Sequence, residues 1–381
     1  MGWKEVDICQ LCDSVSETYK GNASEVVLIN TSDVLDGKCL NHEYVPNKKL
    51  KGQFKKTFRK GDILYSEIRP ANKRFCFVDF EPKDYIASTK LMVLRAHEDV
   101  DPQYLYQILR SNDTLTQLQM LAESRSGTFP QITYSELSNI MVNLPSQKAQ
   151  KNIVSILSSL DRKIELNNKI NADLEEMAQA IFKNWFVDFE PFKKGKFVDS
   201  ELGMIPEGWK VGTLGELCNF KRGKNLLTKN AIDEGVPVVA GGLEPSCYHN
   251  VANTGAPVIT VSGSGANAGF MRMYHVPVWA SDCSFIDISC ENFYFVYCFL
   301  KVNSKLLKHA QTGAVQPHVK PSDIHDFELV IPDRESIYEF QDKVKPFFDK
   351  IAAIQKENSR LSLLRDTLLP RLMSGEIEVP E

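Results

Sequence analysis

One stretch of the sequence, Ile153 to Trp185, repeats apolar residues at a spacing that few folds permit. Its seam positions alternate steps of four and three residues without a break, and it contains neither proline nor glycine. This spacing favours a left-handed coiled coil with a partner helix. The alternative is a single helix lying on a core, but such a helix has a broader apolar face. The seam positions are Ile153, Leu157, Leu160, Ile164, Asn167, Asn171, Leu174, Ala178, Ile181 and Trp185.

A second stretch near the C-terminus has the same spacing and is the expected partner. Antiparallel pairing would bring Asn358 opposite the segment from Asn167 to Asn171, although parallel pairing also brings the two centres together. Pro346 is expected to begin or kink this helix because proline lacks an N–H donor, and Arg365 is expected to extend out of the seam. The seam positions are Val344, Phe347, Ile351, Ile354, Asn358, Leu361, Arg365, Leu368 and Leu372.

The composition is that of a globular protein with reduced cysteines. A chain of 381 residues, 43% hydrophobic and 25% charged, is long enough for two or three domains. No apolar run approaches the roughly 18 residues of a membrane span, and the first residues do not form a signal peptide, so a cytoplasmic location is expected. Cys9 and Cys12 form a single Cys-x-x-Cys without a second pair at zinc spacing.

The chain contains two copies of one module, each a globular part followed by a long helix. Motifs at the start of each copy recur 206 residues apart and motifs at its end recur 187 apart, so the first globular part is 19 residues longer. Such a repeat predicts pseudo-twofold architecture. The paired motifs are Gly2-Trp3-Lys4 and Gly208-Trp209-Lys210, Leu11-Cys12 and Leu217-Cys218, Ser135-Glu136-Leu137 and Ser322-Asp323-Ile324, and Asn143-Leu144-Pro145 and Val330-Ile331-Pro332.

The fold class predicted is α/β (α+β), with two similar mixed α/β modules separated by two long antiparallel helices that form a coiled coil. Apolar runs and turn residues predict strands and one helix in each module. The expected strands are 26–30, 62–68, 75–78, 91–95, 236–240, 257–261, 271–275 and 285–288, and the expected helices are 102–112 and 293–308. The expected boundaries are 1–145 for the first module, 146–190 for the first spacer helix, 191–207 for a linker, 208–332 for the second module and 333–381 for the second spacer helix and tail.

The sequence lacks the motifs that carry catalysis. The glycines Gly263, Gly265 and Gly269 match neither fingerprint of nucleotide-binding loops, so a turn is favoured over a phosphate cradle. The segment 79–83 matches a metal-nuclease pattern only in three common residues. The seven histidines form no His-x-x-x-His pair, and no Gly-x-Ser-x-Gly elbow occurs. We therefore expect no enzymatic activity and no metal site.

Two related modules on a rigid rod suit a ligand with two separated marks, and double-stranded DNA is such a ligand. A seam helix of about 33 residues is roughly 50 Å long at ~1.5 Å per residue, which spans about 15 base pairs. The modules would then read two unlike half-sites with an unread gap between them.

The residues expected to contact DNA combine phosphate-binding cations with base-reading side chains, although a solvated surface position is the alternative for each. In the first module they are Lys48, Lys49, Lys51, Lys55, Lys56, Arg59, Lys60, Tyr65, Ser66, Glu67, Arg69, Asn72, Arg74, Thr128 and Gln131. In the second module they are Lys221, Arg222, Lys224, Ser262, Ser264, Asn267, Thr312, Gln316 and His318.

These patterns resemble the specificity (S) subunit of type I restriction-modification systems. The resemblance covers nearly the whole chain and is carried by Ile156-Leu157-x-x-Leu160-Asp161-x-Lys163-Ile164-Glu165-x-Asn167, Ala180-Ile181-Phe182-x-x-Trp185-Phe186, Gly61-Asp62-Ile63-Leu64 and Leu368-Leu369-Pro370-x-Leu372-x-Ser374-Gly375-Glu376-Ile377. It implies two target-recognition domains joined by spacer helices, two methyltransferase (M) subunits as partners, and restriction (R) subunits for cleavage. It also implies that S-adenosylmethionine, ATP and Mg²⁺ bind to the partner subunits, with no cofactor on this chain.

The leading hypothesis is therefore a non-catalytic reader of a bipartite, asymmetric DNA sequence. The alternative is a protein-interaction scaffold with a coiled-coil rod. Salt-dependent DNA binding by the assembled complex discriminates between them, since a protein scaffold would show little.

Overall fold

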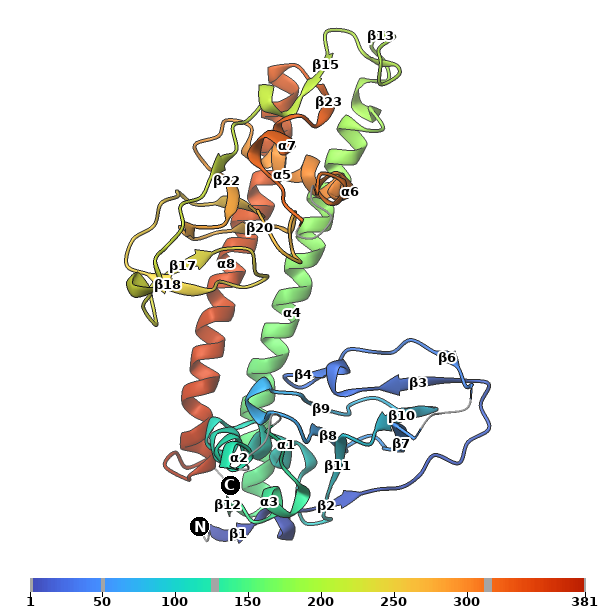
Figure 1. Cartoon of the computed structure of the whole chain (residues 1–381), viewed down its shortest axis with the longest axis vertical. Helices are drawn as coiled ribbons and strands as arrows, with labels where there is room; N and C mark the ends of the chain where they lie inside the picture. Colours follow the sequence, from blue (N-terminus) through green and yellow to red (C-terminus); the bar gives the residue numbers. More distant parts are fainter. Residues whose placement is uncertain (1–2, 49–51, 125–129, 312–316, 380–381) are drawn as a thin grey trace. The chain divides into compact units, whose positions relative to one another are not determined.

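The computed structural model describes residues 3–48, 52–124, 130–311 and 317–379. Its contacts divide the chain into two units, residues 1–165 with 358–381 (unit 1) and residues 166–357 (unit 2). Two 40-residue helices, α4 (Gln147–Phe186) and α8 (Arg334–Met373), each contribute one part to each unit (Figure 1). None of the helices within the described ranges is long and apolar enough to cross a membrane.

Within its described residues, unit 1 contains two four-stranded sheets and three short α-helices, α1 to α3. The first sheet has the order β6-β3-β10-β7 and the second the order β2-β11-β8-β9, and β3 pairs with β10 in parallel. The strands of these sheets are β2 (Cys12–Val15), β3 (Glu25–Ile29), β6 (Val45–Pro46), β7 (Phe54–Lys56), β8 (Ile63–Ser66), β9 (Phe75–Phe77), β10 (Tyr85–Ser88) and β11 (Leu91–Ala96). The remaining elements are the pairs β1 (Lys4–Asp7) with β12 (Met141–Leu144) and β4 (Val34–Leu35) with β5 (Lys38–Cys39), and the helices α1 (Pro102–Arg110), α2 (Asn112–Ser124) and α3 (Tyr134–Ser138).

Unit 2 repeats this arrangement with fewer strands. Its sheets have the orders β18-β17-β21 and β16-β22-β19-β20, and β17 pairs with β21 in parallel. The strands of these sheets are β16 (Lys221–Arg222), β17 (Val236–Val239), β18 (Cys247–His249), β19 (Val258–Ser262), β20 (Met271–Tyr274), β21 (Trp279–Ala280) and β22 (Cys283–Asp287). The remaining elements are β13 (Phe197–Val198) with β14 (Ile205–Pro206), β15 (Lys210–Thr213) with β23 (Glu328–Ile331), and the helices α5 (Phe293–Val302), α6 (Ser304–His309) and α7 (Pro321–His325).

The strand register explains the two offsets of the sequence repeat. Lys4 lies opposite Leu144 in the pair β1–β12, and Lys210 lies opposite Ile331 in the pair β15–β23. The first members of these pairs are 206 residues apart and the second members 187, so both ends of the repeat meet in one antiparallel strand pair. The two similar mixed α/β modules predicted from the sequence are confirmed.

Aromatic side chains dominate the core of unit 2. Phe182 of α4 lies 5.2 Å from Phe295 of α5 and 5.7 Å from Phe340 of α8, measured between ring centroids, and all three are buried. Burial of a phenylalanine side chain contributes roughly 1.5–3 kcal/mol, and each such ring pair adds about 1 kcal/mol. Both long helices are therefore held against the sheet module by the same rings.

Within each unit the parts of α4 and α8 run antiparallel. In unit 2, Phe182 contacts Phe340, whereas Asn167 Nδ2 donates a hydrogen bond to Glu357 at 2.9 Å. In unit 1, Asp161 pairs with Arg365 at 2.9 Å. Within unit 2, residue numbers thus fall along α8 as they rise along α4. Every predicted seam side chain on both helices is buried or half-buried.

Two expectations for the second spacer helix are corrected, namely that it begins at Pro346 and that Arg365 extends out of the seam, whereas a kink at Pro346 stays a prediction. Pro346 does not begin α8, which starts at Arg334 and passes through it. Pro346 and Asp342, whose carbonyl loses a donor to the proline, are both exposed, so water can satisfy that carbonyl. Arg365 does not leave the seam, because Asp161 binds its guanidinium there. In unit 2, Asn167 donates to Glu357, the residue that precedes Asn358 in the sequence. The expected position of Asn358 opposite the segment from Asn167 to Asn171 stays a prediction.

The strands expected from the sequence all overlap observed strands, but the helix expected at 293–308 is divided into α5 and α6 at Asn303. The sequence patterns missed the remaining described strands, among them the four-residue strands β1, β12, β15 and β23 and the buried interior strand β10.

Candidate nucleic-acid interface

In unit 1, three loop segments meet beyond the ends of β8 and β11, held by backbone hydrogen bonds. Glu67 N donates to Lys90 O at 3.1 Å, and Ile132 N donates to Glu67 O at 2.8 Å. Arg69 N donates to Pro130 O at 3.1 Å. These three bonds define what we call the loop frame, and they fix the segment from Glu67 to Arg69 against each of the other two segments.

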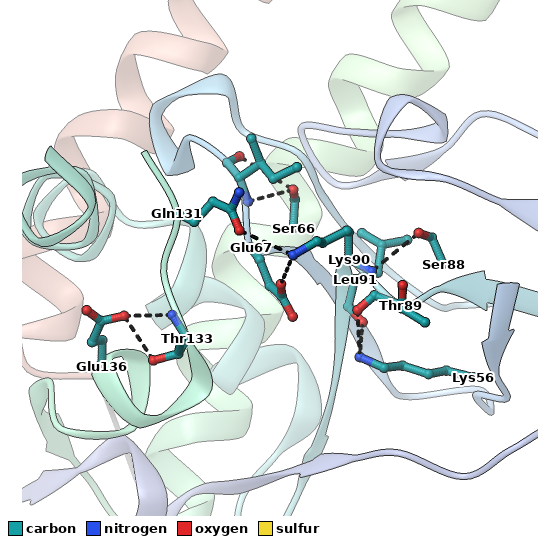
Figure 2. A network of polar contacts seen from close by, with 11 residues as sticks. Lys56, Ser66, Glu67, Ser88, Thr89, Lys90, Leu91, Gln131, Thr133 and Glu136 are labelled. Atoms are coloured by element: carbon teal, nitrogen blue, oxygen red, sulfur yellow. Dashed lines mark hydrogen bonds and ion pairs between the residues drawn. The ribbon is translucent and has the colours of Figure 1, made fainter. Parts of the chain in front are cut away.

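The side chains of Glu67 and Gln131 both reach Lys90 (Figure 2). Its ammonium lies 3.3 Å from Glu67 Oε2 and donates to Gln131 Oε1 at 3.2 Å. A lysine can only donate, so the Gln131 amide turns its oxygen to Lys90 and directs its two N–H donors elsewhere. Lys90 keeps a third donor, and 49% of its side chain is exposed. The cluster therefore offers donors to an incoming ligand.

Two further contacts support this frame from neighbouring elements. Lys56 Nζ donates to Thr89 O at 3.2 Å and to Leu91 O at 2.8 Å, which ties β7 to the turn that carries Lys90. Burial lowers the pKa of Lys56; the Glu67 carboxylate opposes this effect and the Lys90 cation reinforces it. Thr133 N donates to the Glu136 carboxylate at 2.7 Å, the capping box that begins α3.

Unit 2 contains the same loop frame at the ends of β19 and β22. Gly263 N donates to Asp282 O at 3.1 Å, Val319 N donates to Gly263 O at 3.1 Å, and Gly265 N donates to Pro317 O at 3.2 Å. Each bond has its counterpart in unit 1, and the bridge between Ile68 and Gln131 recurs between residues 264 and 318. The backbone is therefore repeated bond for bond.

The backbone angles agree as well. Arg69 and Gly265, which occupy equivalent places, both have left-handed backbone, with φ of 46° and 79°. Glycine adopts this region at little cost, whereas an arginine there is strained. Strain of this kind at an exposed arginine is typical of a functional loop.

The side chains on the second frame are different. Asp282 takes the place of Lys90, and it accepts hydrogen bonds from Arg222 Nη2 on one carboxylate oxygen and from the Ser264 hydroxyl on the other. A Cβ added to Gly263 would lie 2.4 Å from Arg222 Nη1, so the guanidinium would have to move if this residue carried a side chain. In the second module the cation thus comes from β16.

Three of the predicted DNA-binding residues are wrong as direct contacts. Tyr65 is 1% exposed and lies in the core, where its hydroxyl faces Leu109 O and burial raises its pKa far above the usual value. The hydroxyl of Ser66 bonds the backbone of Ile68, and that of Ser262 donates to Gly241 O at 3.3 Å. Strands buried on both faces hide every residue, so alternation does not identify an exposed face.

The other predicted residues have varied surroundings. Arg74 donates to the carbonyls of Ser32 and Val34, and Asn267 donates to Gly241 O. His318 is half-buried in the second loop frame. The exposed ones are Lys48, Lys55, Arg59, Lys60, Arg69, Asn72, Lys221, Arg222 and Lys224. Those outside the described residues are Lys49, Lys51, Thr128, Thr312 and Gln316.

Lys90 and Asp282 were missed from the sequence. They are 192 residues apart, which matches neither repeat offset, so the repeat alone does not align them. Their one sequence signal is a polar residue directly before a buried strand. Among the described residues no group of three or more His, Cys, Asp or Glu side chains could hold a metal ion.

Comparison with known proteins identifies relatives that share this duplicated architecture. The family model "Type I restriction modification DNA specificity domain" matches residues 2–176 and 206–362, one match for each module with its helix. The HindI specificity subunit of Haemophilus influenzae is 33% identical over 98% of this chain and 99% of its own length. The MjaIX specificity subunit of Methanocaldococcus jannaschii is 29% identical over 90% of this chain and 85% of its own length. A solved S subunit from M. genitalium, at 19% identity and a TM-score of 0.57 over 100% of this chain and 97% of that one, has the same fold.

Two DNA specificity domains in one chain define a protein that provides DNA sequence specificity through two recognition modules. The chain belongs to the family of type I restriction-modification specificity subunits.

Proposed function

We propose that each loop frame lies at the surface that reads one half of a bipartite, asymmetric DNA target, and that α4 and α8 set the gap and dock two methyltransferase subunits. The supporting observation is the pair of loop frames, identical in backbone bonds and unlike in side chains. Equal backbones would present both modules to DNA in the same way. Because bases are read by side chains, Lys90 and Glu67 in one frame and Asp282 and Arg222 in the other would read different sequences.

Exposed cations of the first module would supply the sequence-independent part of binding. The chain carries a formal net charge of −4, so attraction to DNA must come from local charge. Lys55, Arg59 and Lys60 are exposed on the segment that leads through β7 to β8. Contacts of this kind position the duplex and make affinity dependent on salt.

The chain itself is proposed to be non-catalytic. The recognition domains would be residues 1–145 and 208–332, with 146–190 and 333–381 as spacer helices and 191–207 as linker. S-adenosylmethionine would bind to the methyltransferase subunits, and ATP and Mg²⁺ would act in complexes that include restriction subunits. Cytoplasmic DNA would be the substrate.

The test is the methylome of the assembled complex. Co-expressed with its methyltransferase subunits, the chain should direct methylation to one motif with two unlike halves and an unspecified gap. Omission of the chain should abolish that methylation, and the isolated chain should methylate nothing. Affinity of the complex for its target should fall steeply with salt. Methylation that persists without the chain, or a continuous motif, would contradict the proposal.

A further inference from the structure

We propose that each half-site contains a guanine that is read by a cation braced by a carboxylate, Lys90 in the first module and Arg222 in the second. This inference rests on the proposed function and adds the base and the side chains. It assigns Glu67 and Asp282 the role of orienting the cation.

In the first module the brace leaves donors free toward the ligand. Glu67 and Gln131 each accept one hydrogen bond from the Lys90 ammonium, at 3.3 and 3.2 Å. Its third N–H and the amide N–H groups of Gln131 remain available. Glu67 itself is fixed through its own backbone, which bonds Lys90 and Ile132. The Lys90 ammonium is therefore held at one place on the frame.

In the second module the cation at the equivalent place is Arg222, which comes from strand β16. Arg222 Nη2 binds Asp282, while Nη1 lies 2.4 Å from the place that a Cβ on Gly263 would occupy. Asp282 is itself anchored by the Ser264 hydroxyl. The guanidinium, whose side chain is 46% exposed, keeps further N–H donors for a ligand.

These donors match one base edge in the major groove. Guanine presents two adjacent acceptors, N7 and O6, and arginine or lysine bound to them is the commonest specific contact. Adenine presents a donor beside N7, which would meet another donor. Although Lys90 and Asp282 have opposite charges, each frame contains a cation held by a carboxylate: Lys90 by Glu67 in the first, and Arg222 by Asp282 in the second.

The ion pairs are poorly explained as stabilising contacts. Lys90 and Arg222 are about half exposed, and exposed pairs contribute little to the free energy of unfolding. Substitution of either cation should therefore leave the fold intact. This separates a reading role from a structural one.

The first experiment compares methylomes of complexes that carry Lys90→Met or Arg222→Met. Each variant should relax one guanine position of one half-site and leave the other half unchanged. Lys60→Ala, the control for a phosphate contact, should weaken methylation without relaxing any position. The inference is overturned if a half-site contains no guanine, if neither motif changes, or if both halves change together. Absence of a bipartite motif in the wild-type complex would instead refute the proposed function.

The second experiment removes one atom from the DNA. A duplex with 7-deazaguanine at the assigned position lacks the N7 acceptor. The wild-type complex should lose about tenfold in affinity or more. The Lys90→Met complex should bind the modified and normal duplexes equally. An equal loss in both complexes would contradict contact between Lys90 and this base. The thermal unfolding midpoints of Lys90→Met and Arg222→Met should equal that of the wild type.

Discussion

Asp161 of α4 accepts hydrogen bonds from two arginines, Arg365 of α8 and Arg110 of α1, each at 2.9 Å. The arginine side chains are only 20% and 10% exposed. One carboxylate therefore joins the recognition module of unit 1 to the unit 1 parts of both long helices. It also explains how a charged residue occupies a seam position.

Replacement of Asp161 by alanine should destabilise the protein strongly. It leaves two largely buried guanidinium groups without this partner, and loss of one member of such a group costs about 3 kcal/mol. Asp366→Ala is the matched control, because it removes another partner of Arg365 that is 56% exposed. That change should cost under about 0.5 kcal/mol. Chemical denaturation measures both values, and equal losses would contradict this account of the seam.

Two asparagines one turn apart on α4 should respond in opposite directions to the same substitution. The side-chain oxygen of Asn171 is buried without a hydrogen-bond partner, so Asn171→Leu should raise the free energy of unfolding by about 1 kcal/mol. Asn167 is 1% exposed and donates to Glu357, so Asn167→Leu should lower it by about 1–2 kcal/mol. Denaturation midpoints of the two variants test the pair. A stabilised Asn167→Leu would show that this hydrogen bond contributes nothing.

Asp333 caps α8 and should make stability depend on acid pH. Burial alone would raise its pKa, but hydrogen bonds from Ser336 N, Ser336 Oγ and Trp209 Nε1 together lower it. A carboxylate with a lowered folded-state pKa stabilises the fold above its unfolded pKa of about 3.9, and this stability is lost as pH falls through the folded value. At pH 7 the free energy of unfolding of the wild type should exceed that of Asp333→Asn by about 1 kcal/mol or less. This difference should shrink below about pH 4. A difference independent of pH, measured by denaturation, would contradict this cause.

Arg69 should show a conflict between stability and DNA binding. Its left-handed backbone costs about 1 kcal/mol relative to glycine, so Arg69→Gly should be more stable than Arg69→Ala by roughly that amount. Both variants should bind target DNA more weakly, because both lack the exposed guanidinium. Thermal unfolding and binding to a target duplex give the two readouts. Full affinity in either variant would exclude Arg69 from the interface.

Periodicity predicted the long helices because their seam repeats over many turns. Strand existence was also predictable, since runs such as Ile63-Leu64-Tyr65 are apolar and bounded by turn residues. Which strand residue faces a ligand was not, because β8 is buried throughout. The pairs β1–β12 and β15–β23 were missed as strands, although their motifs had revealed the repeat.

The candidate site was harder to predict because it forms between distant segments. Glu67 and Gln131 were identified by residue type, yet nothing local indicates that Lys90 lies between them. Gly263 reads as a flexible turn until its contact with Arg222 is known. Long-range backbone bonds, which sequence patterns do not encode, bring these residues together.

The central claim is that two modules of one chain read the two halves of a DNA target independently. It is tested most directly by exchanging residues 208–332 for the corresponding module of another specificity subunit and sequencing the methylome of the resulting complex. We predict a motif that keeps its first half and its gap and acquires a new second half. A motif altered in both halves would contradict independent reading, and so would an unchanged motif.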